Sequence, residues 1–332
     1  MKHFLFSALF LFAFLCFAQD FKVGFSMDDS IAQRWQVEHK ILKRGVENQG
    51  GELIVRLCQS NEQLQVNQSK ELIDLGVDVL IVVPANAASS KEIAEYAKSK
   101  SVPVVAYSRM MTNAPISYYL SFDVRDIGVK QAEYALSKVP KGKYVVLSGP
   151  LKDNNSKLVA EGQMSVLQSA LLSSQIDLVM NKHLQEWTDF EAYMEMNAFM
   201  AEYQGDVDVI IAGNDVIAEG AIRAMNITNQ SNTVVIGLDA ELTACQGMAK
   251  DIQDMSVYLP VVNLASTAAL LASRIAKDDY KSIVQMINAR ENNGLIGVPS
   301  ILLESVQVSK ENLANAIDQY GIHSMEQVFN EK

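Results

Sequence analysis

The chain of 332 residues has little of the chemistry from which common catalytic and metal sites are built. Its four histidines include His39, His183 and His323, which lie far apart and give no zinc-ligand spacing with the three cysteines. It contains neither a GxxxxGKS/T phosphate loop nor a GxSxG nucleophile turn. The paired carboxylates of a glycoside hydrolase depend on a tertiary distance, so a carbohydrate-active enzyme stays open as the weaker alternative. We therefore expect a protein without catalytic residues, metal or cofactor.

Basic side chains are also scarce. The sequence has 28 Lys and Arg against 39 Asp and Glu, which gives a net charge of −11. A chain with this balance has no broad attraction for phosphate backbones or anionic lipid heads. Nucleic acid is therefore not an expected partner.

The first 20 residues contain the chain's long apolar run. Lys2 precedes apolar or small residues from 4 to 17, and polar Gln19 follows. A run of about 14 residues is shorter than the about 20 that a membrane span needs, and a basic start with a small residue at its end fits a cleaved secretion signal. We predict a signal peptide at 1–18 and a mature chain that begins near Gln19. An uncleaved anchor and a lipid on Cys16 are the alternatives.

Two cysteines, Cys58 and Cys245, remain after removal of that segment. Export permits a disulfide between them. Their positions, one at the end of a strand-like run and one inside a helix-like run far along the chain, favour two separate buried thiols.

Short apolar runs alternate with longer segments of helical period, which is typical of stacked βαβ units. Uninterrupted runs such as VLIVV predict a sheet that helices cover on both faces. With 49% hydrophobic residues and this length, the chain is expected to form about two domains. We predict an α/β fold of two doubly wound, Rossmann-like parallel-sheet lobes. The expected strands are 21–26, 53–58, 79–83, 104–107, 144–148, 177–181, 209–212, 234–238 and 301–308. The expected helices are 31–48, 63–75, 89–100, 127–138, 156–173, 190–204, 216–225, 242–250, 261–276 and 311–320.

No long Pro, Gly or Ser linker separates the two series of elements, so we expect several short crossings that hinge about a cleft. The predicted N-terminal lobe comprises residues 19–122 and 259–290. The predicted C-terminal lobe comprises residues 123–258 and 291–332.

Polar side chains follow six of the strand-like runs, and the carboxyl ends of parallel strands are where ligands bind in open α/β sheets. Carboxylates and amides pair with sugar hydroxyls, arginine offers a planar fork of donors, and the only two tryptophans, Trp35 and Trp187, offer flat faces for a ring. The sequence therefore predicts a carbohydrate-binding cleft. The polar residues are Asp28, Asp29, Asn86, Arg109, Asn154, Asn155, Asn214, Asp215 and Asp239.

Each of these residues also has a purely structural interpretation. Asp28 or Asp29 could stabilise the start of a helix, and one of Asn154 and Asn155 is expected to cap one. Arg109 could form an ion pair, and Trp35 could pack in the core. Six strand ends with the same pattern favour a ligand site over capping alone.

The chain resembles periplasmic sugar-binding proteins of type I, the ribose, galactose and xylose class, and the xylose branch in particular. The paired DD…RW and DNN…K segments are more specific to that branch than to the superfamily. The matching segments run in the family's order and are DDSIAQRW (28–35), GVDVLIVVPAN (76–86), AYSRM (106–110), YYLSFD (118–123), DNNSKL (153–158), AEGQM (160–164), GNDVIAEGAI (213–222), LDAEL (238–242) and VYLP (257–260).

The resemblance implies a periplasmic, monomeric protein whose two lobes close on a monosaccharide. The closed form would then dock on the permease of an ABC transporter, or alternatively on the outer domain of a sensor kinase. Repressors that bind DNA share the fold, but the acidic charge and the secretion signal exclude that branch. Trp35 and Trp187 would sandwich the sugar ring. The residues implied or proposed to hydrogen-bond the sugar are Arg34, Arg109, Asn155, Asn214, Asp239, Asp29 and Asn86.

Two positions depart from the xylose branch. Leu259 stands where that branch usually carries a lysine before Pro260, and Ala85 replaces a larger residue. These departures predict either weaker xylose binding than is usual in the branch or a preference for another pentose or hexose, and Leu259→Lys is expected to shift the preference toward xylose.

Overall fold

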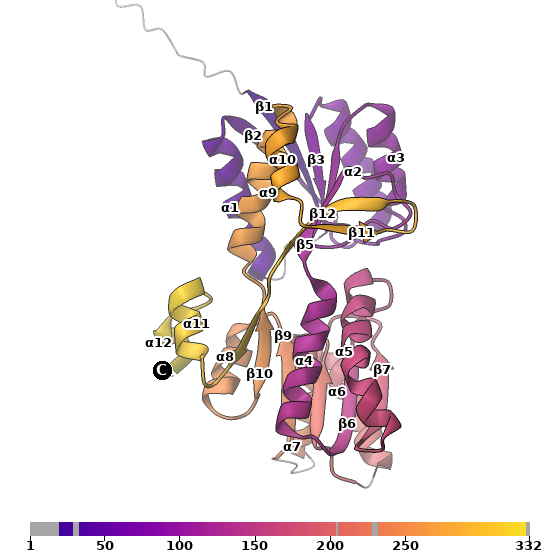
Figure 1. Ribbon diagram of the computed structural model, residues 1–332, viewed down its shortest axis with the longest axis vertical. Helices are drawn as coiled ribbons and strands as arrows, with labels where there is room; N and C mark the ends of the chain where they lie inside the picture. The colour runs from indigo at the N-terminus through magenta and orange to yellow at the C-terminus, as the bar shows by residue number, and fades with distance from the viewer. Residues whose placement is uncertain (1–19, 29–32, 204, 228–231, 330–332) are drawn as a thin grey trace, which may run out of the picture.

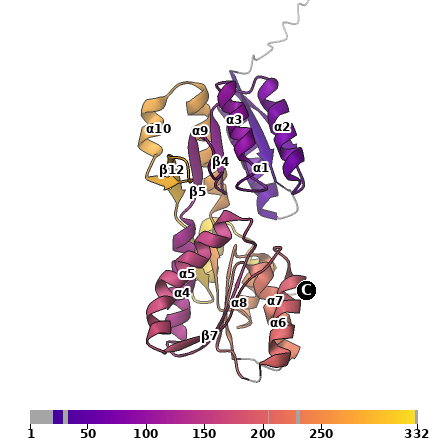
Figure 2. The same ribbon diagram turned by 90° about the vertical axis from the view of Figure 1, so that its right-hand side faces the viewer.

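The computed structural model describes residues 20–28, 33–203, 205–227 and 232–329. Two α/β lobes lie one above the other along the long axis of the molecule and meet at a narrow middle (Figures 1 and 2). The predicted signal segment 1–18 and Asp29 lie outside the described residues.

The N-terminal lobe is built on a seven-stranded sheet with the order β11-β12-β5-β4-β3-β1-β2. Its core strands are buried along their whole length, as the uninterrupted apolar runs predict. All neighbours pair in parallel except β11, which is antiparallel to β12. The strands are β1 (Phe21–Met27), β2 (Gly51–Leu57), β3 (Val79–Val82), β4 (Val104–Tyr107), β5 (Tyr118–Phe122), β11 (Ala289–Asn292) and β12 (Gly297–Leu303).

The C-terminal lobe contains a six-stranded sheet with the order β13-β10-β9-β8-β6-β7. Here only the edge strand β13 runs antiparallel to its neighbour. The two-lobed α/β prediction is confirmed, and the antiparallel edges make both sheets mixed. The strands are β6 (Gly142–Ser148), β7 (Ile176–His183), β8 (Val209–Ala212), β9 (Val234–Leu238), β10 (Met255–Tyr258) and β13 (Val306–Ser309).

Helices cover both faces of each sheet (Figure 2). No helix in the described ranges combines the length and apolar character needed to cross a membrane. Around the first sheet lie α1 (Gln33–Asn48), α2 (Glu62–Asp74), α3 (Lys91–Ser99), α9 (Val261–Ala276) and α10 (Tyr280–Met286). Around the second lie α4 (Val124–Lys138), α5 (Asn154–Leu172), α6 (Asp189–Glu202), α7 (Asp215–Ile227), α8 (Leu242–Ala249), α11 (Leu313–Tyr320) and α12 (Met325–Phe329).

Helices α4 and α5 pack at close range because two glycines face the neighbouring backbone. A side chain at Gly128 would overlap the carbonyl oxygen of Val159, and one at Gly162 would overlap that of Arg125. This contact holds the start of α4, which follows the crossing at residue 123, against the first half of α5. Elsewhere, Cys58 and Cys245 are both buried and free, which confirms two separate thiols.

The chain crosses between the lobes three times. β5 leads into α4 at residue 123, β10 leads into α9 at 259–260, and β12 leads into β13 at 304–305. The predicted third boundary at 290/291 is wrong, because β11 and β12 pair within the first sheet. The sequence shows one β-branched region at 301–308, whereas the structure divides it between strands of different sheets.

Candidate functional site

A cavity of about 730 Å³ lies between the lobes, where the carboxyl ends of both sheets face each other. Seven of the nine residues predicted to contact a ligand line it. They are Arg34, Trp35, Arg109, Asn155, Trp187, Asn214 and Asp239.

Asn86 is not among the lining residues. Its Oδ1 accepts hydrogen bonds from the amides of Ala88 (2.8 Å) and Ser89 (3.2 Å), and its Nδ2 donates to Glu62 (3.0 Å). These contacts stabilise a turn, so the side chain of Asn86 has a structural role. Asn86 therefore does not take the predicted position at the cavity between the lobes.

Arg109 joins the two lobes through carboxylates. Its Nη1 lies 2.7 Å from Oδ2 of Asp28 at the end of β1, and its Nε lies 3.2 Å from Oδ2 of Asp153 at the start of α5. The side chain is 20% exposed and both carboxylates are 10% exposed. Arg109 therefore meets both expectations from the sequence, since it forms an ion pair and also lines the cavity.

Arg34 projects from the first turns of α1 into the same space. Its Nε donates to Glu38 (2.9 Å), its Nη2 donates to Oγ of Ser108 (3.2 Å), and its Nη1 lies 3.8 Å from Asp239 of the other lobe. Glu38 is buried and also accepts from the hydroxyl of Tyr107. Burial raises the pKa of Glu38, although Arg34 and the Tyr107 hydroxyl oppose the shift. This network holds the guanidinium in one orientation.

Trp35 is 6% exposed and packs in the main hydrophobic cluster while its ring borders the cavity. The guanidinium carbon of Arg34 lies 4.4 Å from the ring centroid, and that of Arg109 lies 5.8 Å from it. Cation–π attraction of this kind is worth about 0.5 to 2 kcal/mol per contact. The indole thus organises the two arginines in addition to offering an apolar surface.

Trp187 lies in the loop between β7 and α6 and borders the cavity from the C-terminal lobe. The ring rests on the backbone of Gly149, where a side chain would overlap it, and also approaches Gly213. The loop is tied down because Glu191 accepts hydrogen bonds from the amides of Gln185 and Glu186, each 2.8 Å long. The glycines therefore create the space for this indole.

Gly149→Ala is expected to displace the Trp187 ring and weaken ligand binding by about 1 to 3 kcal/mol, as for an overpacked site. Titration calorimetry and tryptophan emission measure the change. Gly297→Ala is the matched control, because nothing lies within 4 Å of a side chain added there. Equal affinity in both variants would contradict a ligand role for Trp187.

Asn155 carries an unused acceptor. Its Nδ2 donates to the carbonyl of Ser108 across the cleft (2.9 Å), while its Oδ1 is buried and has no partner among the described residues. The sequence led us to expect Asn154 or Asn155 as the cap of α5, but the cap is Asp153, whose Oδ1 accepts from the Asn155 amide (2.9 Å). A buried oxygen without a partner is costly unless a ligand or water donates to it.

Asn214 and Asp239 end adjacent strands of the second sheet. Oδ1 of Asn214 accepts from the Ile217 amide (3.0 Å) at the start of α7, which leaves its Nδ2 to donate to a ligand. Asp239 lies in a turn in which it and Ala240 have positive φ angles of 99° and 51°. Burial raises the pKa of Asp239, and Arg34 and Arg109 oppose the shift.

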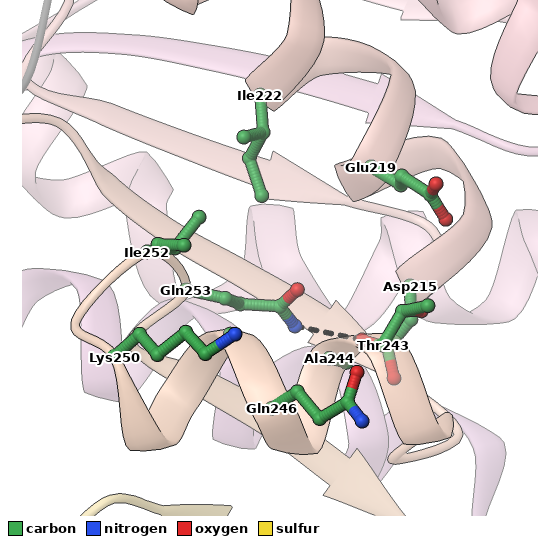
Figure 3. A pocket seen from close by; sticks show the side chains of 10 residues that line it. Asp215, Glu219, Ile222, Thr243, Ala244, Gln246, Lys250, Ile252 and Gln253 are labelled. Atoms are coloured by element: carbon green, nitrogen blue, oxygen red, sulfur yellow. Dashed lines mark hydrogen bonds between the residues drawn. The ribbon is translucent and has the colours of Figure 1, made fainter. Parts of the chain in front are cut away.

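That turn is held by buried Asp215, which borders a second cavity of about 250 Å³ beside α7 and α8 (Figure 3). Asp215 accepts hydrogen bonds from Gln253 (2.8 Å), the Glu241 amide (2.9 Å) and Ser256, and Ser256 in turn accepts from the Ala240 amide. Burial raises the pKa of Asp215 to about 8 against the effect of these donors. Asp215, at the edge of this second cavity, therefore supports the turn that carries Asp239.

The sequence did not single out several residues that line the cavity. Asp153 and Ser108 touch predicted residues directly, and their positions in the DNN and YSR segments could have indicated them. Lys152 and Glu186 form an ion pair of 2.8 Å, for which the sequence offers no signal because they are far apart in the chain. The two departures from the xylose branch, Ala85 and Leu259, also line the cavity.

Comparison with known proteins agrees with this geometry. Residues 23–279 match the model of the periplasmic binding protein domain family. The chain is 34% identical over 307 residues to the D-xylose-binding periplasmic protein of Escherichia coli strain K12, with 92% of each chain covered. It is 32% identical over 323 residues to the D-xylose-binding periplasmic protein of Haemophilus influenzae, which covers 97% of this chain and 96% of that relative.

A solved structure shows the same fold. The carbohydrate transporter solute binding protein from Chloroflexus aurantiacus, in complex with D-glucose, matches with a TM-score of 0.84 at 23% identity and covers 93% of this chain and 98% of that one. The resemblance inferred from the motifs is thus confirmed, and the chain belongs to the periplasmic binding protein domain family.

Proposed function

We propose that this protein captures a neutral monosaccharide between its lobes in the periplasm and presents it to the permease of an ABC transporter. The observation that carries this proposal is the unpartnered, buried Oδ1 of Asn155 in a cavity that also holds two oriented arginines and two indoles. A sugar hydroxyl supplies the missing donor, and the apolar face of a sugar ring suits an indole.

The charges around the cavity favour a neutral ligand. Among the described residues that line the cavity, six are acidic and three are basic, which gives a formal charge of 3 − 6 = −3. The three basic residues, Arg34, Arg109 and Lys152, are each already paired with a carboxylate. A uronate or sugar phosphate would therefore meet repulsion, and none of the basic side chains in the described part of the lining is free to bind it.

Contacts between the lobes support capture by closure. Arg109 pairs with Asp153 across the cleft, Asn155 donates to Ser108, and Arg125 at the start of α4 lies 3.6 Å from Glu291 on β11. A ligand that bridges the same side chains stabilises the closed arrangement relative to the open one. The relatives' D-xylose and the solved structure's D-glucose are both neutral aldoses, which fits this class of ligand.

Mature protein beginning near Gln19 is expected to give saturable heat with at least one neutral pentose or hexose in titration calorimetry and to return the sugar unchanged. Glucuronate and glucose 6-phosphate serve as charged controls and are expected to bind at least tenfold more weakly, since a like charge about 4 Å away costs about 4 kcal/mol near a protein surface and about 1.4 kcal/mol already gives a tenfold loss. Conversion of the sugar, or tighter binding of the charged compounds, would contradict the proposal.

A further inference from the structure

One wall of the interlobe cavity is apolar. Its residues lie at two crossings between the lobes, in the first turn of α4, in the second turn of α5 and at the end of β9. All its residues are at most 9% exposed and belong to a single hydrophobic cluster. They are Phe122, Val124, Ile127, Val159, Leu238 and Leu259.

The residues of this wall come from several elements of the fold. Phe122 ends β5 and Leu259 follows β10, so both sit at crossings. Val124 begins α4 and Val159 lies early in α5, and these two helices are in close contact where Gly128 meets the backbone of Val159 and Gly162 meets that of Arg125. The wall therefore draws on both lobes and on the hinge.

Three peptide groups beside the wall are already engaged. The Asp123 amide donates to Leu303 (3.2 Å), the Asp239 amide donates to Val257 (2.8 Å), and the Leu259 carbonyl accepts from Val261 (2.7 Å). A sugar hydroxyl turned to this wall would leave water without gaining a new partner, which is unfavourable. An apolar carbon in the same place would gain from burial.

Resting on the proposed function, we infer that the preferred ligand turns a methyl group to this wall, which makes it a 6-deoxyhexose. The polar residues Arg34, Arg109 and Asn155 line the same cavity, where they can meet the hydroxyl-bearing part of the ring. The cavity volume of about 730 Å³ lies within the range of about 300 to 1,000 Å³ typical of small-molecule sites, so a sixth carbon fits. A pentose lacks that carbon and fills less of the wall.

Calorimetric titrations with matched pairs test the inference. The pairs are D-glucose with 6-deoxy-D-glucose, D-galactose with 6-deoxy-D-galactose, and L-mannose with L-rhamnose, and D-xylose is added. The best-bound pair is expected to favour the deoxy sugar by about 10- to 100-fold, the range by which an apolar pocket discriminates a hydroxyl. Equal or tighter binding of the hydroxylated member, or of D-xylose, would overturn the inference while leaving the proposed function standing. Failure of every sugar to bind would reject the proposed function itself.

Two wall variants add an independent test. Val124→Thr keeps the side-chain volume and adds a hydroxyl, and Leu259→Gln adds an amide. Each is expected to reduce the preference for the deoxy sugar about tenfold, because the hydroxyl of the ordinary hexose gains a partner. Leu172→Gln is the control, since Leu172 is 81% exposed at the end of α5. If Leu259→Gln fails to fold, Val124→Thr decides, and an unchanged preference in the folded variant would overturn the inference.

Discussion

Arg109→Lys is expected to weaken sugar binding by about 2 to 5 kcal/mol of binding free energy. This is the cost of leaving one member of a buried charge pair unpaired. The guanidinium reaches Asp28 through Nη1 and Asp153 through Nε at the same time. A lysine ammonium is a single point charge and lacks that fork. One of the two carboxylates, each 10% exposed, is then left without its cation beside the ligand.

Arg125→Lys is the matched control for this change. Arg125 also bridges the lobes, through Glu161 and Glu291, but its side chain is 54% exposed and does not line the cavity. Exposed pairs contribute about 0 to 1 kcal/mol, so its affinity should stay close to wild type. Calorimetry gives the affinities, and thermal unfolding without sugar gives the stabilities. An Arg109→Lys protein that loses stability but binds sugar normally would restrict Arg109 to a structural ion pair.

Trp35→Ala is expected to lower the free energy of unfolding by about 3 to 5 kcal/mol and also to weaken binding, because the indole is buried and carries two guanidinium contacts. Trp187→Ala removes a half-buried ring and should weaken binding by about 1 to 3 kcal/mol with a smaller loss of stability.

Fluorescence assigns the two contributions. Since the chain has two tryptophans, each variant keeps one, and sugar should change the emission of both single-tryptophan proteins. If saturating sugar leaves the emission of the Trp187→Ala protein unchanged, Trp35 does not contact the ligand and only packs in the core.

The sequence predicts the architecture well because the pattern that carries it is local. Uninterrupted apolar runs such as 79–82 and 209–212 become fully buried strands, and the helices between them begin and end within a few residues of expectation. The third crossing is misplaced because only residues 304–305 separate β12 from β13, and only tertiary pairing assigns the two strands to different sheets. The sequence also does not predict β10 and β11, which consist of four residues each.

For the cavity, the strand-end rule places Arg109, Asn155 and Asp239 together correctly, because it follows from sheet geometry. It fails for Asn86, whose side chain serves the turn that follows its strand. The rule also cannot distinguish a helix cap from a ligand contact. It therefore does not single out Asp153, which caps α5. The sequence alone shows which positions reach the edge of a sheet, whereas the partners of a side chain depend on loops of other strands.

A crystal structure of the protein with a saturating neutral monosaccharide tests the central claim most directly. The account predicts a sugar ring in the interlobe cavity beside Trp35 and Trp187, with a hydroxyl donating to Oδ1 of Asn155 at about 2.7 to 2.8 Å. Density for the sugar in the cavity beside α7 and α8, or a cleft in which Asn155 Oδ1 remains without a donor, would contradict it.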